Sequence, residues 1–183
     1  TASLLLDGNS DYLTIPDSDD WNFGTGDFTL DMWIYLNNLP AEDTNKMLLS
    51  QENAGDDSRL SFYLGDDGGV HHLSMYVRDL GSLLVYNTFH LSSNFAANTW
   101  YHIAFVRTGN DFEAFVDGIQ QDSTVQDTDL LPDVDGRLYI GARATLTNLF
   151  DGYIDEFRVS KGIARWAANF IVPTSEYAAV SYK

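Results

Sequence analysis

Short stretches in which every second residue is apolar recur along the whole chain. In residues 27–36, "DFTLDMWIYL", the even positions are apolar and share one face, whereas the odd positions, including Trp33, share the other. This period of two is typical of a β-strand with one face in a core. The pattern returns in seven further stretches, each bounded by Gly, Asn or Asp: "RLSFYLG", "HLSMYVRD", "LLVYNTFHL", "WYHIAFVRTG", "FEAFVDG", "RLYIGA" and "GYIDEFRVS".

Many short strands without intervening helices predict an all-β fold, either an antiparallel sandwich or a closed barrel. The pairs Gly109-Asn110 and Asp117-Gly118 are typical of tight hairpin turns. Only residues 160–170, "SKGIARWAANF", resemble a helix, of a turn or two. No linker divides the chain, and 183 residues can bury a sizeable core without disulfides, so we expect residues 1–183 to form a single domain.

The charge of the chain excludes some classes of partner. Ten Lys and Arg stand against 27 Asp and Glu, a formal net charge of -17, which repels nucleic acids and anionic membranes. No apolar run reaches the roughly 18 residues of a membrane span, so we expect no membrane insertion. The chain begins at Thr1 without a signal sequence, and we interpret it as a processed protein or an excised domain.

The motifs of common enzyme classes are missing. No strand carries the alternating acids with which many glycosidases flank a glycosidic bond. There is no Cys, no Gly-x-Ser-x-Gly and no phosphate-binding glycine loop. The four histidines lack a Ser and Asp context for a nucleophilic triad. We therefore predict no catalysis, with a polysaccharide lyase using Tyr, His and Arg as the remaining enzymatic alternative.

The stretch "LDGNSDYL" contains a candidate metal site. Asp7, Asn9 and Asp11 stand at alternate positions in a tight turn, and oxygen donors converging from a loop suit Ca²⁺. Calcium takes six or more ligands, so a second segment must contribute. The alternative is a turn in which Asp and Asn bind the local backbone.

Polar and aromatic side chains gather on the predicted outward faces of two strands. With the leucines of these strands inside, Tyr63, His72, Tyr76 and Arg78 point outward, and Trp33 is expected across from them. Aromatic rings stack on sugars, and His and Arg bind hydroxyl or carboxylate groups, so these five residues are the predicted ligand site.

The tryptophans also have a structural interpretation. Trp33 is equally compatible with a second core beneath surface loops. Trp21, Trp100 and Trp166 are interpreted as packing residues near strand ends.

Several stretches, in order, resemble the laminin G type 3 domains of the concanavalin A-like lectin and glucanase superfamily. The stretches that carry this resemblance are "LLLDGNSDYLTIPDSDDWNFGTGDFTLDMWIYL", "NTWYHIAFVRTGNDFEAFVDG", "LYIGA" and "FDGYIDEFRVSKGIARW". The resemblance implies an antiparallel two-sheet jelly roll whose late strand, "GYIDEFRVS", returns beside the first and brings Asp155 near the calcium turn. If alternation on that strand is regular, Glu156 and Arg158 point to one face of the sheet, and Asp155 and Val159 point to the other.

The resemblance leaves two functions open. The first is a non-catalytic carbohydrate-binding or adhesion module that binds a glycan or glycosylated surface through a concave sheet or its rim loops. The second is a structural or protein-interaction module without a sugar site. Both imply a larger multidomain or fibrous protein, in an extracellular, cell-surface or virion location, and we expect a structural Ca²⁺.

Overall fold

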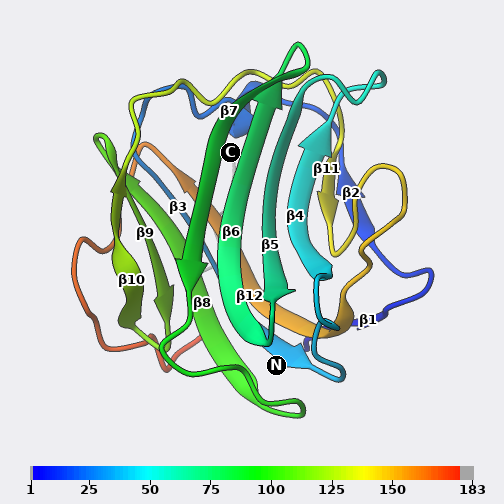
Figure 1. Ribbon diagram of the computed structural model, residues 1–183, viewed down its shortest axis with the longest axis vertical. Helices are drawn as coiled ribbons and strands as arrows, with labels where there is room; N and C mark the ends of the chain where they lie inside the picture. The colour runs from blue at the N-terminus through cyan, green and yellow to red at the C-terminus, as the bar shows by residue number, and fades with distance from the viewer. Residues whose placement is uncertain (1, 178–183) are drawn as a thin grey trace.

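Two six-stranded antiparallel sheets face each other in the computed structural model, which describes residues 2–177 (Figure 1). Sheet A contains, in spatial order, β1 (Leu4–Asp7), β12 (Asp151–Lys161), β3 (Phe28–Leu36), β8 (Trp100–Thr108), β9 (Asp111–Val116) and β10 (Ile119–Gln126). Sheet B contains β2 (Leu13–Ile15), β11 (Leu138–Ile140), β4 (Asn45–Glu52), β5 (Arg59–Asp67), β6 (Val70–Asp79) and β7 (Ser82–His90). This confirms the predicted all-β jelly-roll sandwich.

Helical structure is nearly absent from the described residues. A single 3₁₀ turn, Asp19–Trp21, lies between β2 and β3. Within residues 2–177, no helix has both the length and the apolar character to cross a membrane.

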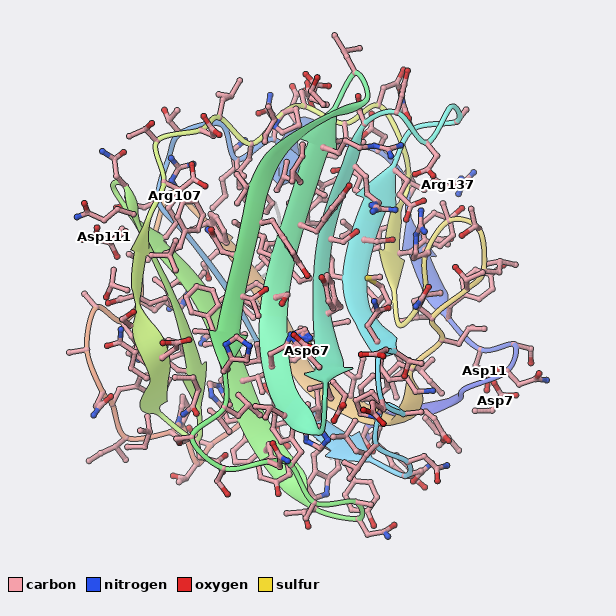
Figure 2. All side chains as sticks on the ribbon, in the orientation of Figure 1. Asp7, Asp11, Asp67, Arg107, Asp111 and Arg137 are labelled. Carbon is pink, nitrogen blue, oxygen red and sulfur yellow. The ribbon has the colours of Figure 1, made fainter. Side chains whose placement is uncertain are left out.

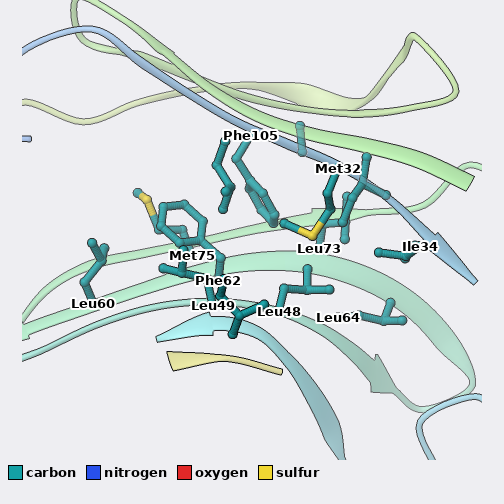
Figure 3. Close-up of a cluster of buried hydrophobic side chains, with 14 of the residues drawn as sticks. Met32, Ile34, Leu48, Leu49, Leu60, Phe62, Leu64, Leu73, Met75 and Phe105 are labelled. Carbon is teal, nitrogen blue, oxygen red and sulfur yellow. The ribbon is translucent and has the colours of Figure 1, made fainter. Parts of the chain in front are cut away.

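The core lies between the sheets and is built from the predicted inward faces. β3 contributes its even-numbered residues, and β5 and β6 contribute their leucines together with Phe62 and Met75 (Figure 3). The ring of Phe62 meets Phe28 and Phe105 edge-on, at centroid distances of 5.9 and 5.0 Å. Alternation along the strands is therefore what separates core from surface.

β12 returns beside β1, as predicted. Leu4 is opposite Ile154, Asp7 is opposite Asp151, and the other edge of β12 pairs with β3. The last long strand of the chain therefore closes sheet A next to its first strand.

A bulge in β12 interrupts the alternation that the sequence led us to expect. Asp155 is opposite Trp33 and Arg158 is opposite Asp31, so Glu156 and Phe157 are inserted where β3 has one residue. Glu156 has a φ of +50°. The predicted separation of Asp155 from Arg158 is wrong: both lie on the outer face of sheet A, and Val159 packs against the core.

The chain after β12 is not helical, so the helix predicted in residues 160–170 is wrong. Residues 162–177, here called the C-terminal segment, instead lie over the outer face of sheet A. Trp166 and Phe170 stack at 3.9 Å and cover Phe115, and the Phe170 N–H donates to the Gly118 carbonyl over 2.9 Å. The segment thus satisfies its backbone by binding a hairpin turn and not by forming a helix.

A buried polar cluster lies under this segment. Arg158 donates two hydrogen bonds to Asp31, at 3.0 and 2.8 Å, and the Tyr177 hydroxyl donates to the same carboxylate over 2.5 Å. His102 lies 3.5 Å from Asp31, and both side chains are fully buried. This cluster connects the C-terminal segment to the middle of sheet A.

Candidate functional site

The outer face of sheet B brings together four of the five predicted ligand residues. Tyr76 is opposite Ser61 on β5, Tyr63 is opposite Ser74 on β6, and His72 is opposite Gly65. These pairs alternate with the buried leucines, so their side chains share the outward face. Arg78 continues the same row of β6. The predicted orientation of Tyr63, His72, Tyr76 and Arg78 is confirmed.

Two adjoining hollows, of about 300 and 210 Å³, form a groove across this face. We call it the sheet B groove. Asn45, Tyr63 and Tyr86 line both hollows. The first hollow is also lined by Met47, Arg59, Ser61, Tyr76, Arg143 and Asn148, and the second by Asp43, Thr44, Asp66, Asp67 and His72. Asp67, at the end of β5, is labelled in Figure 2.

The floor of the groove is aromatic. The rings of Tyr76 and Tyr86 meet edge to face at 5.9 Å, and Tyr86 is 54% exposed. The guanidinium of Arg59 lies 4.4 Å from the centre of the Tyr76 ring. Ring faces flanked by fixed donors can stack on a sugar and hydrogen-bond to its hydroxyls.

Two buried polar atoms in the groove lining have no hydrogen-bond partner in the part of the chain that the structure describes. Ser61 is 2% exposed, and its Oγ forms no hydrogen bond within the described part of the chain; the same is true of Arg59 Nε. Buried polar atoms are almost always hydrogen-bonded. A water molecule or a ligand hydroxyl in the groove would satisfy both atoms.

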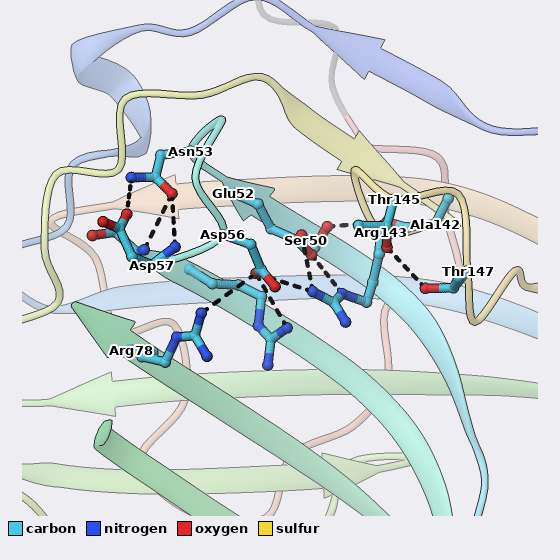
Figure 4. Close-up of polar contacts among 12 residues, drawn as sticks. Ser50, Glu52, Asn53, Asp56, Asp57, Arg78, Ala142, Arg143, Thr145 and Thr147 are labelled. Carbon is cyan, nitrogen blue, oxygen red and sulfur yellow. Dashed lines mark hydrogen bonds and ion pairs between the residues drawn. The ribbon is translucent and has the colours of Figure 1, made fainter. Parts of the chain in front are cut away.

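An arginine network borders one end of the groove. Asp56 accepts from Arg143 at 3.1 Å and lies 3.8 Å from Arg78 (Figure 4). Arg143 also holds Glu52 through two hydrogen bonds, of 2.7 and 3.1 Å. Arg59 lies 3.6 Å from Asp56 as well, so all three arginines pair with this loop residue. Arg59 and Arg143 also line the groove, whereas Arg78 does not.

Two titratable side chains of the groove, His72 and Tyr63, are held in their neutral forms near pH 7. Burial, followed by the nearby His90, lowers the pKa of His72 below its ordinary value. Burial, followed by Tyr86, raises the pKa of the Tyr63 hydroxyl. A neutral imidazole can both donate and accept, and a protonated phenol can donate, which suits a ligand rich in hydroxyl groups.

Trp33 lies elsewhere, so its predicted place across from Tyr63 and Tyr76 is wrong. It belongs to the outer face of sheet A, which the core separates from sheet B. There it lines a separate pocket with Trp100 and Asp155. Trp100, at the start of β8, packs against the rings of Tyr35 and Tyr153, at centroid distances of 5.5 and 6.3 Å, although 39% of it is exposed. Trp166 also packs, against Phe170.

The predicted calcium ligands are not brought together. Asp7 Oδ1 accepts from the backbone N–H groups of Asn9 and Asp11, at 2.9 and 3.0 Å, which is the local turn given as the alternative. The Ser10 N–H also donates to Asp7 Oδ1. These three backbone hydrogen bonds, of which the one from Ser10 has the largest effect, hold the pKa of Asp7 well below its usual range. Figure 2 shows Asp7 and Asp11 in this loop, at the margin of the molecule.

Asp155 is too far along β12 to complete this set. The residue opposite Asp7 is Asp151, and four residues of strand separate it from Asp155, roughly 13 Å. Among the described residues, no three His, Asp or Glu side chains form a group that could hold a metal. Asp7, Asn9, Asp11 and Asp155 therefore do not fit a shared Ca²⁺ site.

The groove residues missed in the sequence include Tyr86, Arg59 and Arg143, which supply much of its aromatic and basic character. Tyr86 lies on a stretch that was correctly predicted as a strand, and its outward position follows from that alternation. Arg59 stands at the first position of its strand, and Arg143 lies in a loop after β11. Period-two patterning carries no information about loop residues, so only the fold brings Arg143 to the groove.

Several solved structures share this fold. Domain 4 of an extracellular GH43 arabinanase from Geobacillus stearothermophilus, solved with arabinotriose, aligns with a TM-score of 0.67 at 15% identity, covering 88% of this chain and 71% of that one. The LG4-5 domains of the mouse laminin α1 chain align with a TM-score of 0.60 at 17% identity, covering 87% of this chain and 41% of that one. At these identities the likeness shows the fold alone.

A third structure is a carbohydrate-binding module by name. The CBM40 of an IT-sialidase from Ruminococcus gnavus aligns with a TM-score of 0.57 at 14% identity, covering 83% of this chain and 90% of that one. The curated proteins compared with this chain contain no match. The model of the laminin G type 3 family, described as the concanavalin A-like lectin/glucanases superfamily, matches residues 7–167, and the chain therefore belongs to this family.

Proposed function

We propose that this chain is a non-catalytic carbohydrate-binding or adhesion module and that it binds its glycan in the sheet B groove. The observation that carries the proposal is the pairing of an aromatic floor with two buried donors, Ser61 Oγ and Arg59 Nε, that have no hydrogen-bond partner within residues 2–177. The arabinotriose bound to the arabinanase domain supports it at the level of the fold.

Several features favour binding without catalysis. The buried acid and imidazole closest to a catalytic pair, Asp31 and His102, have no exposed surface and lie under the C-terminal segment. Asp66, in the groove, lies 3.4 Å from His71, whose Nδ1 accepts from the Phe95 N–H. These acids are engaged in structural contacts, so neither is free to protonate a leaving group.

We place the module in a larger extracellular, cell-surface or virion protein and treat residues 1–183 as one domain of it. Weak binding at one groove, in the micromolar to millimolar range, would become useful through multivalent display on such an assembly.

A glycan array, read with and without EDTA, tests the proposal. We expect specific, saturable hits that are lost in Tyr76→Ala and Tyr86→Ala. Tyr12→Ala is the matched control, because Tyr12 is an exposed tyrosine outside the groove. Silence across the array would favour the alternative, a structural or protein-interaction module, and release of unsaturated products would instead identify a lyase.

A further inference from the structure

A second pocket, of about 410 Å³, lies on the opposite side of the molecule from the sheet B groove. Its base is the outer face of sheet A, where Trp33 of β3 and Trp100 of β8 project, and Asp155 of β12 is opposite Trp33 in the strand register. Residues 173–176 of the C-terminal segment form another wall. Two indole rings thus border one cavity.

Three carboxylates also line this pocket: those of Asp155, Glu156 and Glu176. No Lys, Arg or His is among its lining residues, and none of the ion pairs found in residues 2–177 involves these acids. The nearby Arg158 is already held by Asp31 at 2.8 Å. The pocket therefore carries negative charge that the described protein does not neutralise.

The β12 bulge is what gives the pocket two adjacent acids. Regular alternation would send Glu156 to the face opposite Asp155, but the bulge, with Glu156 at a φ of +50°, lets both line the same cavity. One oxygen of Glu156 accepts from the Tyr177 N–H at 2.7 Å, which fixes the carboxylate beside the pocket.

We propose that this pocket binds a quaternary ammonium group. Among aromatic side chains, the indole ring of Trp is the best partner for a cation. Quaternary ammonium ligands are recognised by aromatic rings, which take the place of the weakly held water around the cation. Nearby carboxylates add attraction without requiring a hydrogen-bond donor, which a quaternary ammonium lacks. The net charge of -17 adds long-range attraction for any cation.

The same charges argue against other occupants. A polyanionic glycan would meet three carboxylates and no base among the described lining residues, so the pocket differs from the sheet B groove, which Arg59 and Arg143 line. The proposal concerns a different face of the protein and does not depend on the glycan site.

Choline and its uncharged isostere, 3,3-dimethylbutan-1-ol, test the proposal by calorimetry on the full chain. We expect choline and tetramethylammonium to bind in the micromolar to millimolar range, and the isostere to bind at least tenfold more weakly. Added salt should weaken choline binding, because it screens the carboxylates. Equal affinities for choline and the isostere would overturn the proposal, as would displacement of choline by a neutral oligosaccharide.

Variants locate the site. Trp100→Ala should weaken choline binding roughly three- to thirtyfold, the range of one cation–π contact. Glu156→Gln and Glu176→Gln should each weaken it several-fold, whereas Glu42→Gln, which removes an exposed acid outside the pocket, should leave it unchanged. Because the two Glu→Gln changes preserve side-chain shape, they measure the contribution of the carboxylates to choline binding even if Trp100→Ala fails to fold. Unchanged affinity in both Glu→Gln variants would overturn the assignment.

A vesicle experiment distinguishes the source of the ammonium group. Sedimentation with phosphatidylcholine vesicles that free choline reverses would identify a lipid headgroup, and choline binding without sedimentation would identify a soluble ligand. Choline binding that persists undiminished in Trp100→Ala would contradict the pocket in either case.

Discussion

At the scale of single residues, the position of His72 depends on the absence of a side chain at Gly65. A Cβ at Gly65 would lie 2.2 Å from His72 Nε2. We predict that Gly65→Ala displaces the imidazole, lowers the free energy of unfolding by about 1–3 kcal/mol and weakens glycan binding. Urea denaturation and calorimetry would measure the two effects. Gly55→Ala, where a Cβ meets only the Asp57 carboxyl group, at 3.4 Å or more, is the control, and equal behaviour of the two variants would contradict this account.

The buried Asp31 predicts a specific dependence of stability on pH. Burial opposes its ionisation, but hydrogen bonds with His102, Arg158 and Tyr177 outweigh burial and lower the pKa of Asp31 below 3.8. A lowered pKa contributes stability that is fully present above the unfolded value and is lost as pH falls through the folded value.

We therefore expect Asp31→Asn to cost about 3 kcal/mol or more at pH 7, because Arg158 loses its buried partner. The difference from wild type should shrink as the pH falls below about 4. Urea denaturation midpoints of wild type and Asp31→Asn, measured at pH 7 and at pH 3, give this difference in stability. A difference that is the same at pH 7 and pH 3 would refute the role of the Asp31 charge.

At the scale of elements, the C-terminal segment is held by side chains. Phe170 stacks on Trp166 and meets Phe115 edge-on at 5.4 Å, whereas the next residue, Ile171, is 95% exposed. We predict that Phe170→Ala lowers the free energy of unfolding by about 2 kcal/mol, a fall in melting temperature of roughly 4–8 °C. Ile171→Ala should stay near wild type. Similar losses in both variants would show that the segment does not depend on this contact.

Calcium remains a prediction, now without Asp155 as a ligand. A metal held only by the native state stabilises it by about 2.7 kcal/mol at a hundredfold excess over Kd. Because Asp155 is roughly 13 Å along β12 from the residue opposite Asp7, we expect Asp155→Asn to retain any increase in melting temperature that calcium produces in wild type. A calcium response that Asp155→Asn abolishes would restore the original ligand set.

The strands were predictable where their alternation is unbroken, and bulges explain the main errors. β3, β5 and β6 follow a period of two, which identified the core and the outward Tyr63, His72 and Tyr76. β4 was missed because its register shifts between Met47 and Leu49, which leaves adjacent leucines buried and no alternation to read.

Contacts between residues that are distant in the chain could not be predicted from the sequence either. Glu156 lines a pocket because of the bulge in β12. The C-terminal segment lies on sheet A because Phe170 contacts Phe115 and Tyr177 binds Asp31, both of which are distant in the sequence. Patterning within a short window cannot show such contacts.

At the scale of the whole molecule, charge governs which ligands can approach. The net charge of -17 repels polyanions until salt screens it over roughly 8 Å at physiological strength. We predict that binding of an acidic glycan to the sheet B groove holds or improves as salt is added, whereas choline binding to the other pocket weakens. Calorimetric titrations at low and physiological salt measure both trends, and a steep loss of acidic-glycan affinity with salt would contradict the first.

The most direct test of the glycan site is a nuclear magnetic resonance titration of the labelled protein with the best array glycan. The account predicts chemical-shift changes concentrated on the outer face of sheet B, at Ser61, Tyr63, Tyr76 and Tyr86, with little change at Trp33 and Trp100. Changes confined to the outer face of sheet A, or to the loop that contains Asp7, would contradict it.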